Sequence, residues 1–233
     1  MKTIGLLGGM SWESTANYYR LLNQGINKRL SGLHSARIAM VSVDFAPLEQ
    51  FMRQGNWLEC GKILVESARS VEAAGADFLL ICTNTMHKLA PAIADAISIP
   101  LLHIADATAV AIKTQNFKTV GLLGTRFTME EDFYRDRLTS NHGLRVIIPS
   151  APDRHLVDRI IFDELCRGIV KEESRIHYFR IMAEMVGRGA EAIIAGCTEI
   201  GLLISPEQAP RPLFDTTVIH VDEAIRMAFL EDG

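Results

Sequence analysis

The sequence lacks any apolar run long enough to cross a bilayer, so a membrane-spanning helix is not expected. Residues 1–5 lead directly into a strand-like segment and lack the layout of a signal peptide. Basic residues do not dominate either, because the net charge at pH 7 is −4. Nothing in this balance indicates a nucleic acid or an anionic membrane as a partner, and we expect a cytoplasmic protein.

Cysteine is also scarce, with four residues in 233. They form no CxxC motif and no Cys/His cluster with the spacing of zinc ligands, so we predict neither a disulfide framework nor a metal site. The nucleotide-binding patterns GxGxxG and GK[ST] are absent as well, which argues against a nucleotide site.

What the chain does contain is an alternation of short apolar runs and amphipathic segments. The composition, 48% hydrophobic and 22% charged, is that of a globular protein. Strands alternating with helices indicate a parallel sheet with right-handed crossovers, so the sequence predicts the α/β class. We expect strands at 2–7, 37–43, 76–81, 100–104, 120–125, 144–148, 190–196 and 212–215. We expect helices at 11–30, 57–74, 86–97, 106–113, 129–141, 153–168, 172–187 and 217–229. Residues 44–56 should form a loop with a short helical piece.

The second half of this pattern repeats the first. VGLLGT at 120–125 echoes IGLLGG at 4–9, and Cys197-Thr198 echoes Cys82-Thr83 at nearly the same distance along each half. Similarity at one long offset indicates two copies of one fold. We expect two pseudo-symmetric parallel-sheet domains facing each other across a cleft. The first would contain residues 1–105 with the C-terminal helix at about 215–233, and the second residues 106–214.

Cys82 and Cys197 are the candidate catalytic residues. Each ends a buried, strand-like run and is followed by polar residues suited to a helix N-terminus. Ligands bind at the carboxyl ends of strands in open α/β sheets, and a helix N-terminus there stabilises a thiolate. Free cysteine is most often a small buried hydrophobe, which is how we interpret Cys60 and Cys166. The repeated position of the other two favours a paired function.

Two thiols on opposite walls of a cleft could invert a stereocentre. One thiolate would take a proton from a carbon while the other thiol gives a proton to the opposite face. A helix end that lowers the thiol pKa from about 8.5 would make this base available near neutral pH. Fixed donors would have to stabilise the enolate-like carboxylate. The polar residues placed for this are Thr83, Asn84, Thr85 and Thr198. A redox pair stays open, because the spacing does not decide whether the two cysteines form a disulfide.

Other polar residues near these strand ends admit two interpretations. The Gly-rich turn at 8–12 and its counterpart at 124–126 either pack closely against neighbours or contact a ligand. We favour contact with a small carboxylate because both border the predicted cleft. Glu199 either complements a helix dipole or binds a substrate amino group. We interpret four others as structural or solvated before any family is considered: His87, His103, Lys171 and Arg53.

Three segments together resemble the aspartate/glutamate racemase family: IGLLGGMSWEST at 4–15, CTNTMH at 82–87 and GCTEI at 196–200. The resemblance covers nearly the full chain and is closest to the bacterial branch of broad-specificity or aspartate/glutamate-specific amino-acid racemases. It implies two facing α/β domains, racemisation without pyridoxal phosphate or metal, and a homodimer. It also implies that Cys82 and Cys197 are the two opposed bases.

The resemblance extends to the substrate contacts. Archaeal aspartate racemases hold the side-chain carboxylate with an arginine after the second strand and a lysine in the second half. Lys171 corresponds to the lysine, whereas residues 42–47 lack the arginine, so both an acidic substrate and a neutral one such as homoserine stay open. The substrate-binding residues implied are Thr83, Asn84, Thr85, Thr198 and Glu199, with Met10 and Thr125 near them, Lys171, and Met52 and Arg53 as substitutes for the arginine.

The expected function is therefore the racemisation of a small amino acid by two cysteines without a cofactor. One alternative is a related isomerase of the superfamily, such as a hydantoin racemase-like or maleate isomerase-like enzyme, or a hydrolase with one cysteine as nucleophile. The presence of both cysteines argues against the one-cysteine malonate decarboxylase of the same superfamily. A further alternative is a non-catalytic amino-acid-binding protein on the same fold.

Overall fold

The structure, a computed structural model, describes residues 1–230 and divides into two compact units. The first contains Met1–His103 and the chain from His220 onward, and the second contains Ile104–Ile219. The boundaries expected from the sequence, 105 and about 215, differ from these divisions by a few residues. Residues 231–233, the end of the expected C-terminal helix, lie outside the described residues. Within residues 1–230, no helix has the length and apolar character needed to cross a membrane.

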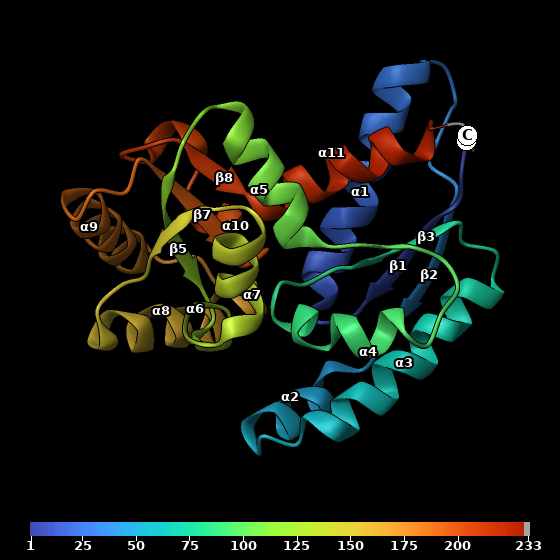
Figure 1. The fold of residues 1–233 in the computed structure, drawn as a ribbon, viewed down its shortest axis with the longest axis horizontal. Coiled ribbons are helices and arrows are strands. Elements are labelled where there is room, and N and C mark those ends of the chain that lie inside the picture. Colours follow the sequence, from blue (N-terminus) through green and yellow to red (C-terminus); the bar gives the residue numbers. More distant parts are fainter. Residues whose placement is uncertain (231–233) are drawn as a thin grey trace. The chain divides into compact units, whose positions relative to one another are not determined.

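The first unit is built on a four-stranded parallel sheet with the order β2-β1-β3-β4 (Figure 1). Its strands are β1 (Ile4–Gly8), β2 (Ile38–Ser42), β3 (Phe78–Ile81) and β4 (Leu101–Leu102). β1 and β3 are buried along their whole length, which explains their uninterrupted apolar sequences. In the register of the sheet Leu7 pairs with Ile81, so the residues that follow β1 and β3 leave the sheet side by side.

Helices cover both faces of this sheet. They are α1 (Trp12–Leu30), α2 (Phe45–Arg53), α3 (Trp57–Ala73), the 3₁₀ helix Thr85–Leu89, α4 (Ala90–Ala94) and α11 (Thr216–Ala228), which crosses the division between the units. Tyr18 and Leu22 of α1 and Val221 of α11 share one apolar core with β1 and β3. Gly25 allows α11 to approach α1, because a β-carbon there would lie 2.2 Å from the Cδ1 atom of Ile225.

The second unit repeats this plan with the strand order β6-β5-β7-β8, again all parallel. Its strands are β5 (Thr119–Gly124), β6 (Arg145–Ile147), β7 (Ala192–Gly196) and β8 (Leu213–Asp215). Its helices are α5 (Ile104–Thr114), α6 (Arg126–Glu130), α7 (Asp132–Asp136), a π-helical turn (Arg137–Asn141), α8 (Ala151–Asp163), α9 (Glu172–Gly187), α10 (Ile200–Leu203) and the 3₁₀ turns Leu165–Arg167 and Pro206–Gln208. The identical strand order in the two sheets confirms the α/β class predicted from the sequence.

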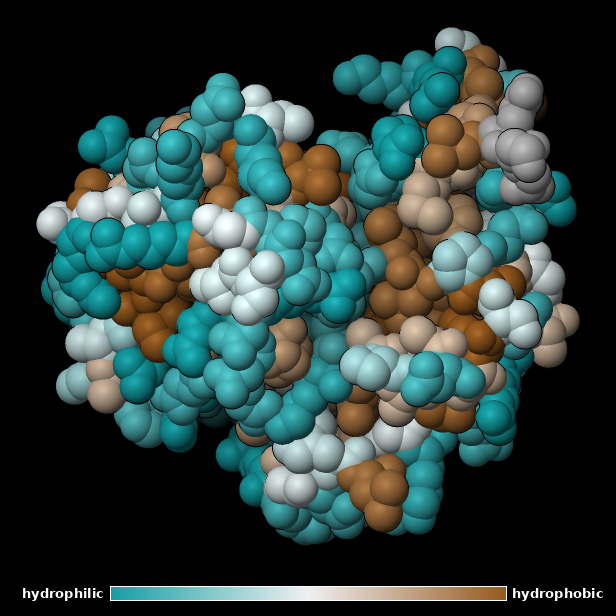
Figure 2. All heavy atoms as spheres, viewed as in Figure 1, coloured by the Kyte–Doolittle hydropathy of each residue, from teal (hydrophilic) through white to brown (hydrophobic). Residues whose placement is uncertain are grey.

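The sheet of the second unit is covered by apolar side chains on both faces. One core joins α8 and α9 to the sheet, and the other joins α5 and α7 to its opposite face. Figure 2 shows hydrophilic side chains over most of the visible surface of this unit and hydrophobic side chains gathered over part of the first.

Three of the predicted helices are interrupted. The segment 153–168 leaves the α-helix after Asp163, and the 3₁₀ turn Leu165–Arg167 follows. The segment 86–97 forms the 3₁₀ helix Thr85–Leu89 and then the short helix α4, which restarts with Pro91 in its first turn. Proline has no N–H for the preceding turn and is tolerated at a helix start, so it divides the segment. The segment 129–141 is divided at Glu131, whose extended backbone (ψ 155°) ends α6 before α7 begins.

The segment 44–56, expected as a loop with a short helical piece, is mostly the helix α2. The carboxylate of Asp44 caps it by accepting a hydrogen bond from the N–H of Ala46 at 3.2 Å. Pro47 lies in the first turn, where its missing N–H removes no helical hydrogen bond. Proline at this position therefore does not prevent a helix.

Candidate active site

The two cysteines follow equivalent strands at the topological switch of each sheet. In the first sheet the chain goes from β1 to β2 on one side and then to β3 on the other, and in the second sheet β5, β6 and β7 repeat this order. A crevice forms at the carboxyl ends of the two strands where the direction of winding reverses. Cys82 directly follows β3, and Cys197 directly follows β7. The topology therefore directs attention to the carboxyl ends of β1 and β3 and of β5 and β7.

The backbone of Cys82 is held by two hydrogen bonds, and its side chain is buried. Its N–H donates to the carbonyl of Leu7 at 2.9 Å, and its carbonyl accepts a hydrogen bond from the hydroxyl of Ser14 at 3.0 Å. The thiol is fully buried and belongs to the core formed by α1, α11, β1 and β3. Thr83 after it is partly exposed, whereas Asn84 and Thr85 are buried.

The turn between β1 and α1 is tightly fixed beside this cysteine. The N–H of Gly9 donates to the hydroxyl of Thr15 at 2.8 Å, and that hydroxyl donates to the carbonyl of Ser11 at 2.9 Å. The side chain of Ser11 caps α1 by accepting from the N–H of Ser14. Met10 is buried within this turn, and its peptide bond to Ser11 is cis.

Cys197 has a carboxylate partner. Its thiol donates to Oε2 of Glu199 at 3.0 Å, and the hydroxyl of Thr198 donates to the same oxygen at 2.7 Å. The thiol of Cys166 contacts the other oxygen, Oε1, at 3.9 Å. All of Cys197, Thr198 and Glu199 are buried, with Glu199 only 4% exposed. Thr125, after β5, is buried too and caps α6 by accepting from the N–H of Thr128.

Cys166 packs against the core of the second unit, as expected of a structural cysteine, and its thiol also contacts Glu199. It follows α8 in the 3₁₀ turn Leu165–Arg167, far from Glu199 in sequence, and its thiol still reaches the carboxylate. No echo in the first half marks it, because the contact arises only from the packing of that turn.

The expectation that helix N-termini lower the thiol pKa is wrong in this structure. Burial raises the pKa of Cys82. Burial, and to a lesser extent the negative charge of Glu199, raises the pKa of Cys197 well above its usual value. The segments after the cysteines are a five-residue 3₁₀ helix and a four-residue α-helix, and neither has a side-chain cap. Such short segments offer little of the dipole that would offset desolvation.

The first unit contains a buried group of three histidines, one of which contacts the bend that follows Cys82. The rings of His87 and His103 are 4.5 Å apart between centroids, and those of His87 and His220 are 6.0 Å apart. Nε2 of His220 donates to the carbonyl of Leu102 at 3.0 Å, so Nδ1 accepts the hydrogen bond from the hydroxyl of Tyr18 at 2.9 Å. Burial lowers the pKa of His220 to about 4, and burial with the neighbouring histidines lowers the pKa of His87 well below its usual value.

These histidines make the fold sensitive to acid. In the unfolded chain a histidine takes up its proton near pH 6.5, whereas His220 in the fold takes it up only near pH 4. Between these values the unfolded chain binds more protons, so the free energy of unfolding falls as the pH falls, by about 3 kcal/mol from this residue. Urea unfolding at a series of pH values should show this decline. It should be shallower in His220→Gln and unchanged in His155→Gln, which alters an exposed histidine. Equal slopes in all three proteins would contradict the assignment.

Comparison with known proteins places the chain in a family. The sequence pattern described as Asp/Glu/Hydantoin racemase matches residues 7–224. The chain belongs to the Asp/Glu/Hydantoin racemase family. It is 23% identical over 219 residues to the broad specificity amino-acid racemase RacX of Bacillus subtilis (strain 168), with 92% of each protein covered.

Solved structures of related proteins agree with this family. A candidate Asp/Glu racemase of Yersinia pestis is 51% identical, with a TM-score of 0.92 and 99% of this chain and 100% of that chain covered. An aspartate racemase homologue from Pyrococcus horikoshii OT3 is 32% identical, with a TM-score of 0.84 and 98% and 99% covered. The resemblance noted in the sequence is therefore confirmed.

Three residues proposed for substrate binding from the racemase resemblance lie away from the cysteines in sequence. Lys171 is an exposed residue at the start of α9, where its ammonium group pairs with Glu164 at 3.1 Å. Met52 is buried within α2, and Arg53 is exposed at the end of α2 and pairs with Glu49. Their contact with a substrate stays a prediction.

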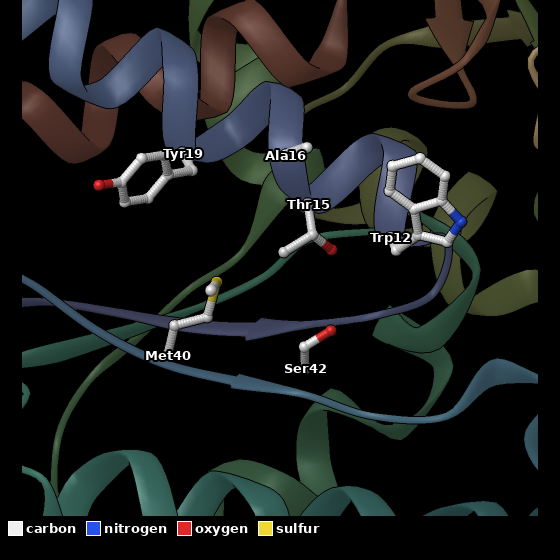
Figure 3. Close-up of a pocket in the computed structure, with 6 residues that line it drawn as sticks. All are labelled: Trp12, Thr15, Ala16, Tyr19, Met40 and Ser42. Carbon is white, nitrogen blue, oxygen red and sulfur yellow. The ribbon is translucent and has the colours of Figure 1, made fainter.

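The first unit of this racemase-family chain also has a surface hollow of about 320 Å³ between α1 and β2. Figure 3 shows Trp12, Thr15, Ala16 and Tyr19 of α1 above Met40 and Ser42 of β2. The hollow lies on the β2 side of β1, whereas Cys82 follows β3 on the other side. Thr15, which lines this hollow, also fixes the turn between β1 and α1.

Proposed function

We propose that this chain is a cofactor-independent amino-acid racemase in which Cys82 and Cys197 are the two bases. The observation that carries the proposal is the equivalent position of the two cysteines. Each follows the third strand of a repeated sheet at its topological switch, in a chain of the Asp/Glu/Hydantoin racemase family. The relatives named as racemases support an amino acid as the substrate class.

The proposed reaction moves one proton off the α-carbon and another onto it. In one direction the thiolate of Cys197 takes the α-proton, and the electron pair of the C–H bond moves into the carboxylate as an enolate. The thiol of Cys82 then gives its proton to the opposite face of the carbon, which restores the carboxylate and leaves Cys82 as the thiolate. The reverse direction exchanges the two roles, so each enantiomer is converted by the same pair of groups.

Glu199 is the group that would prepare Cys197. Its carboxylate already accepts the thiol hydrogen at 3.0 Å, which is within reach for transfer of that proton. The hydroxyl of Thr198 donates to the same oxygen and holds the carboxylate in place. We propose that Glu199 takes the thiol proton when Cys197 acts as base. After the turnover Cys197 holds the former α-proton, so Glu199 gives its proton to solvent and the Cys82 thiolate takes one from solvent.

The buried thiols need a positive charge to ionise, because burial raises the pKa of both. The α-ammonium group of an amino acid supplies that charge, and an opposite charge within about 4–6 Å favours the thiolate. Thr83, Asn84 and Thr85 would donate hydrogen bonds to the carboxylate, where the charge of the enolate develops. Substrate binding and thiol ionisation are thus coupled in this proposal.

A racemisation screen tests the proposed function. Purified protein without added pyridoxal phosphate is incubated with each enantiomer of aspartate, glutamate, homoserine and the other chiral amino acids, and the products are separated by chiral chromatography. We expect at least one amino acid to approach an equal mixture from both directions. No conversion of any amino acid would refute the proposal. A stable covalent adduct on Cys82 would favour a nucleophilic mechanism, and tight binding without conversion would favour an amino-acid-binding protein.

Replacing Glu199 with glutamine should separate its two effects on Cys197. The variant loses the proton acceptor, so kcat/KM for racemisation should fall by about 10²-fold or more. It also loses the negative charge that raises the pKa of Cys197, so alkylation of this thiol by iodoacetamide should reach its half-maximal rate at a lower pH. Alkylation of Cys82 in the same sample is the control and should keep its pH profile. An unchanged profile at Cys197 would contradict the proposed pair.

A further inference from the structure

His87 makes two hydrogen bonds to the bend that follows Cys82. Its ring Nδ1 lies 2.8 Å from the carbonyl oxygen of Thr83, and its backbone N–H donates to the carbonyl of Asn84 at 3.1 Å. A carbonyl can only accept, so Nδ1 carries the hydrogen. The two residues directly after the cysteine are thus fixed by one histidine.

The ring of His87 also packs against two other buried histidine rings. It packs against His103 at 4.5 Å and against His220 at 6.0 Å, and His220 is fixed by its bonds to Tyr18 and to the carbonyl of Leu102. His87 is 1% exposed and His220 is fully buried, so solvent does not compete for these bonds. The ring therefore has one defined orientation and one defined tautomer.

The neighbours of His87 lie at the two points where the chain changes units. His103 is the last residue of the first unit before the chain enters the second, and His220 is the first residue after its return. His87 thus contacts the residue at which the chain leaves the first unit, the residue at which the chain returns to it, and the bend after Cys82. A histidine in this position connects three separate segments of one unit.

Simple core packing does not account for a histidine here. Burial and the neighbouring rings make protonation of His87 unfavourable, as the strong lowering of its pKa indicates. An apolar side chain would fill the same space without the cost of burying a polar ring. What an apolar side chain cannot supply is the N–H donor to the carbonyl of Thr83.

We propose that His87 is a positioning residue for Cys82, and that its ring N–H fixes the Thr83 carbonyl and thereby the orientation of the thiol and of the 83–85 backbone amides. The inference rests on the proposed racemase function for its catalytic meaning, since a positioned thiol matters only where the thiol reacts. The hydrogen bond keeps Cys82 buried and aligned, and its loss frees the bend. Misplacement of a reacting group by about 1 Å can cost about 10²-fold in rate.

Site-resolved alkylation tests this positioning without relying on activity. His87→Leu removes the ring N–H, whereas His87→Asn keeps a donor at the place of Nδ1 in a side chain of nearly the same size as leucine. Native protein and both variants are treated with iodoacetamide, and mass spectrometry of peptides gives the rate at each cysteine. We expect His87→Leu to raise the alkylation rate of Cys82 at least tenfold and His87→Asn to keep it within about threefold of native.

Two cysteines in the same molecule serve as internal controls. Cys60 is fully buried in α3 of the same unit, and Cys197 lies in the other unit. A rise at Cys82 alone supports positioning. A parallel rise at Cys60 means that His87 serves only the packing of the unit, and it would overturn the proposal. An unchanged rate at Cys82 in His87→Leu, or an equal rise in His87→Asn, would overturn it too.

Racemisation kinetics then connect the positioning to the reaction. His87→Leu should lower kcat/KM by about 10-fold to 10²-fold, His87→Asn should recover most of it, and His34→Leu, which changes an exposed histidine, should match native protein. If native protein racemises no amino acid, the proposed function fails while the alkylation rates still decide the positioning. If native protein is active and His87→Leu keeps full activity, the inference fails and the proposed function stands.

Discussion

Replacing Cys82 or Cys197 with serine should lower kcat/KM for racemisation at least about 10³-fold, the largest effect of any single substitution considered. Serine nearly matches cysteine in size, but its hydroxyl is far too weak an acid to supply the base. Each variant keeps one thiol and should exchange the α-proton of only one enantiomer. The two variants should differ in which enantiomer they exchange, because each remaining thiol would serve one face of the carbon.

The matched control is Cys60→Ser. Cys60 is as deeply buried as Cys82, and its thiol contacts the carbonyl of Leu48 at 3.7 Å, so serine there suffers the same change of chemistry and burial. We expect this variant to keep racemisation within about twofold of native protein. Measurements by chiral chromatography and by NMR of α-proton loss in D₂O give both rates. Full racemase activity in either Cys82→Ser or Cys197→Ser would contradict the roles assigned to the two thiols.

The second large effect is on folding, and it comes from Gly9→Ala. Gly9 has φ at +93°, and a β-carbon there would lie 2.2 Å from the carbonyl oxygen and 2.5 Å from the nitrogen of Val43. Both obstacles are backbone atoms that cannot rotate away. We expect the free energy of unfolding to fall by at least about 3 kcal/mol, or the turn beside Cys82 to be displaced.

Gly55→Ala isolates the contribution of the backbone conformation. Gly55 also has a positive φ of +70°, but a β-carbon there would meet nothing within 4 Å. This variant should lose only about 1–2 kcal/mol. Urea unfolding of the three proteins provides the comparison. Equal losses in Gly9→Ala and Gly55→Ala would show that the contact with Val43 does not constrain the turn.

The sequence predicts the fold well because buried strands and amphipathic helices have different sequence patterns. The buried central strands are continuous apolar runs, and the echo between residues 4–9 and 120–125 indicates the repeated sheet. The two candidate cysteines are predicted by the same means, since each directly follows a run of this kind. Breaks within helices are harder to predict from the sequence. Glu131, for example, carries no sequence feature that indicates an extended backbone.

Features that depend on tertiary packing were missed or judged wrongly. The pKa values of the thiols were expected to fall, since the sequence shows the potential caps but not that the helical segments after them have only five and four residues. The contact of Cys166 with Glu199 joins segments 33 residues apart, and no local pattern indicates it. His87 is buried, as expected of a core or capping histidine, but its bond to the carbonyl of Thr83 depends on the orientation of its ring and has no signal in the sequence. A homodimer stays a prediction from the resemblance, and a cytoplasmic location stays a prediction from the composition of the sequence.

The central claim is that two different groups take and give the α-proton. The most direct measurement is a single turnover of each pure enantiomer in D₂O, with deuterium at the α-carbon read by NMR in both product and recovered substrate. Two bases predict deuterium in the product and none in the recovered substrate, from both directions. Deuterium in the recovered substrate at the level of the product, or transfer of the original proton to the product, would indicate a single base and contradict the account.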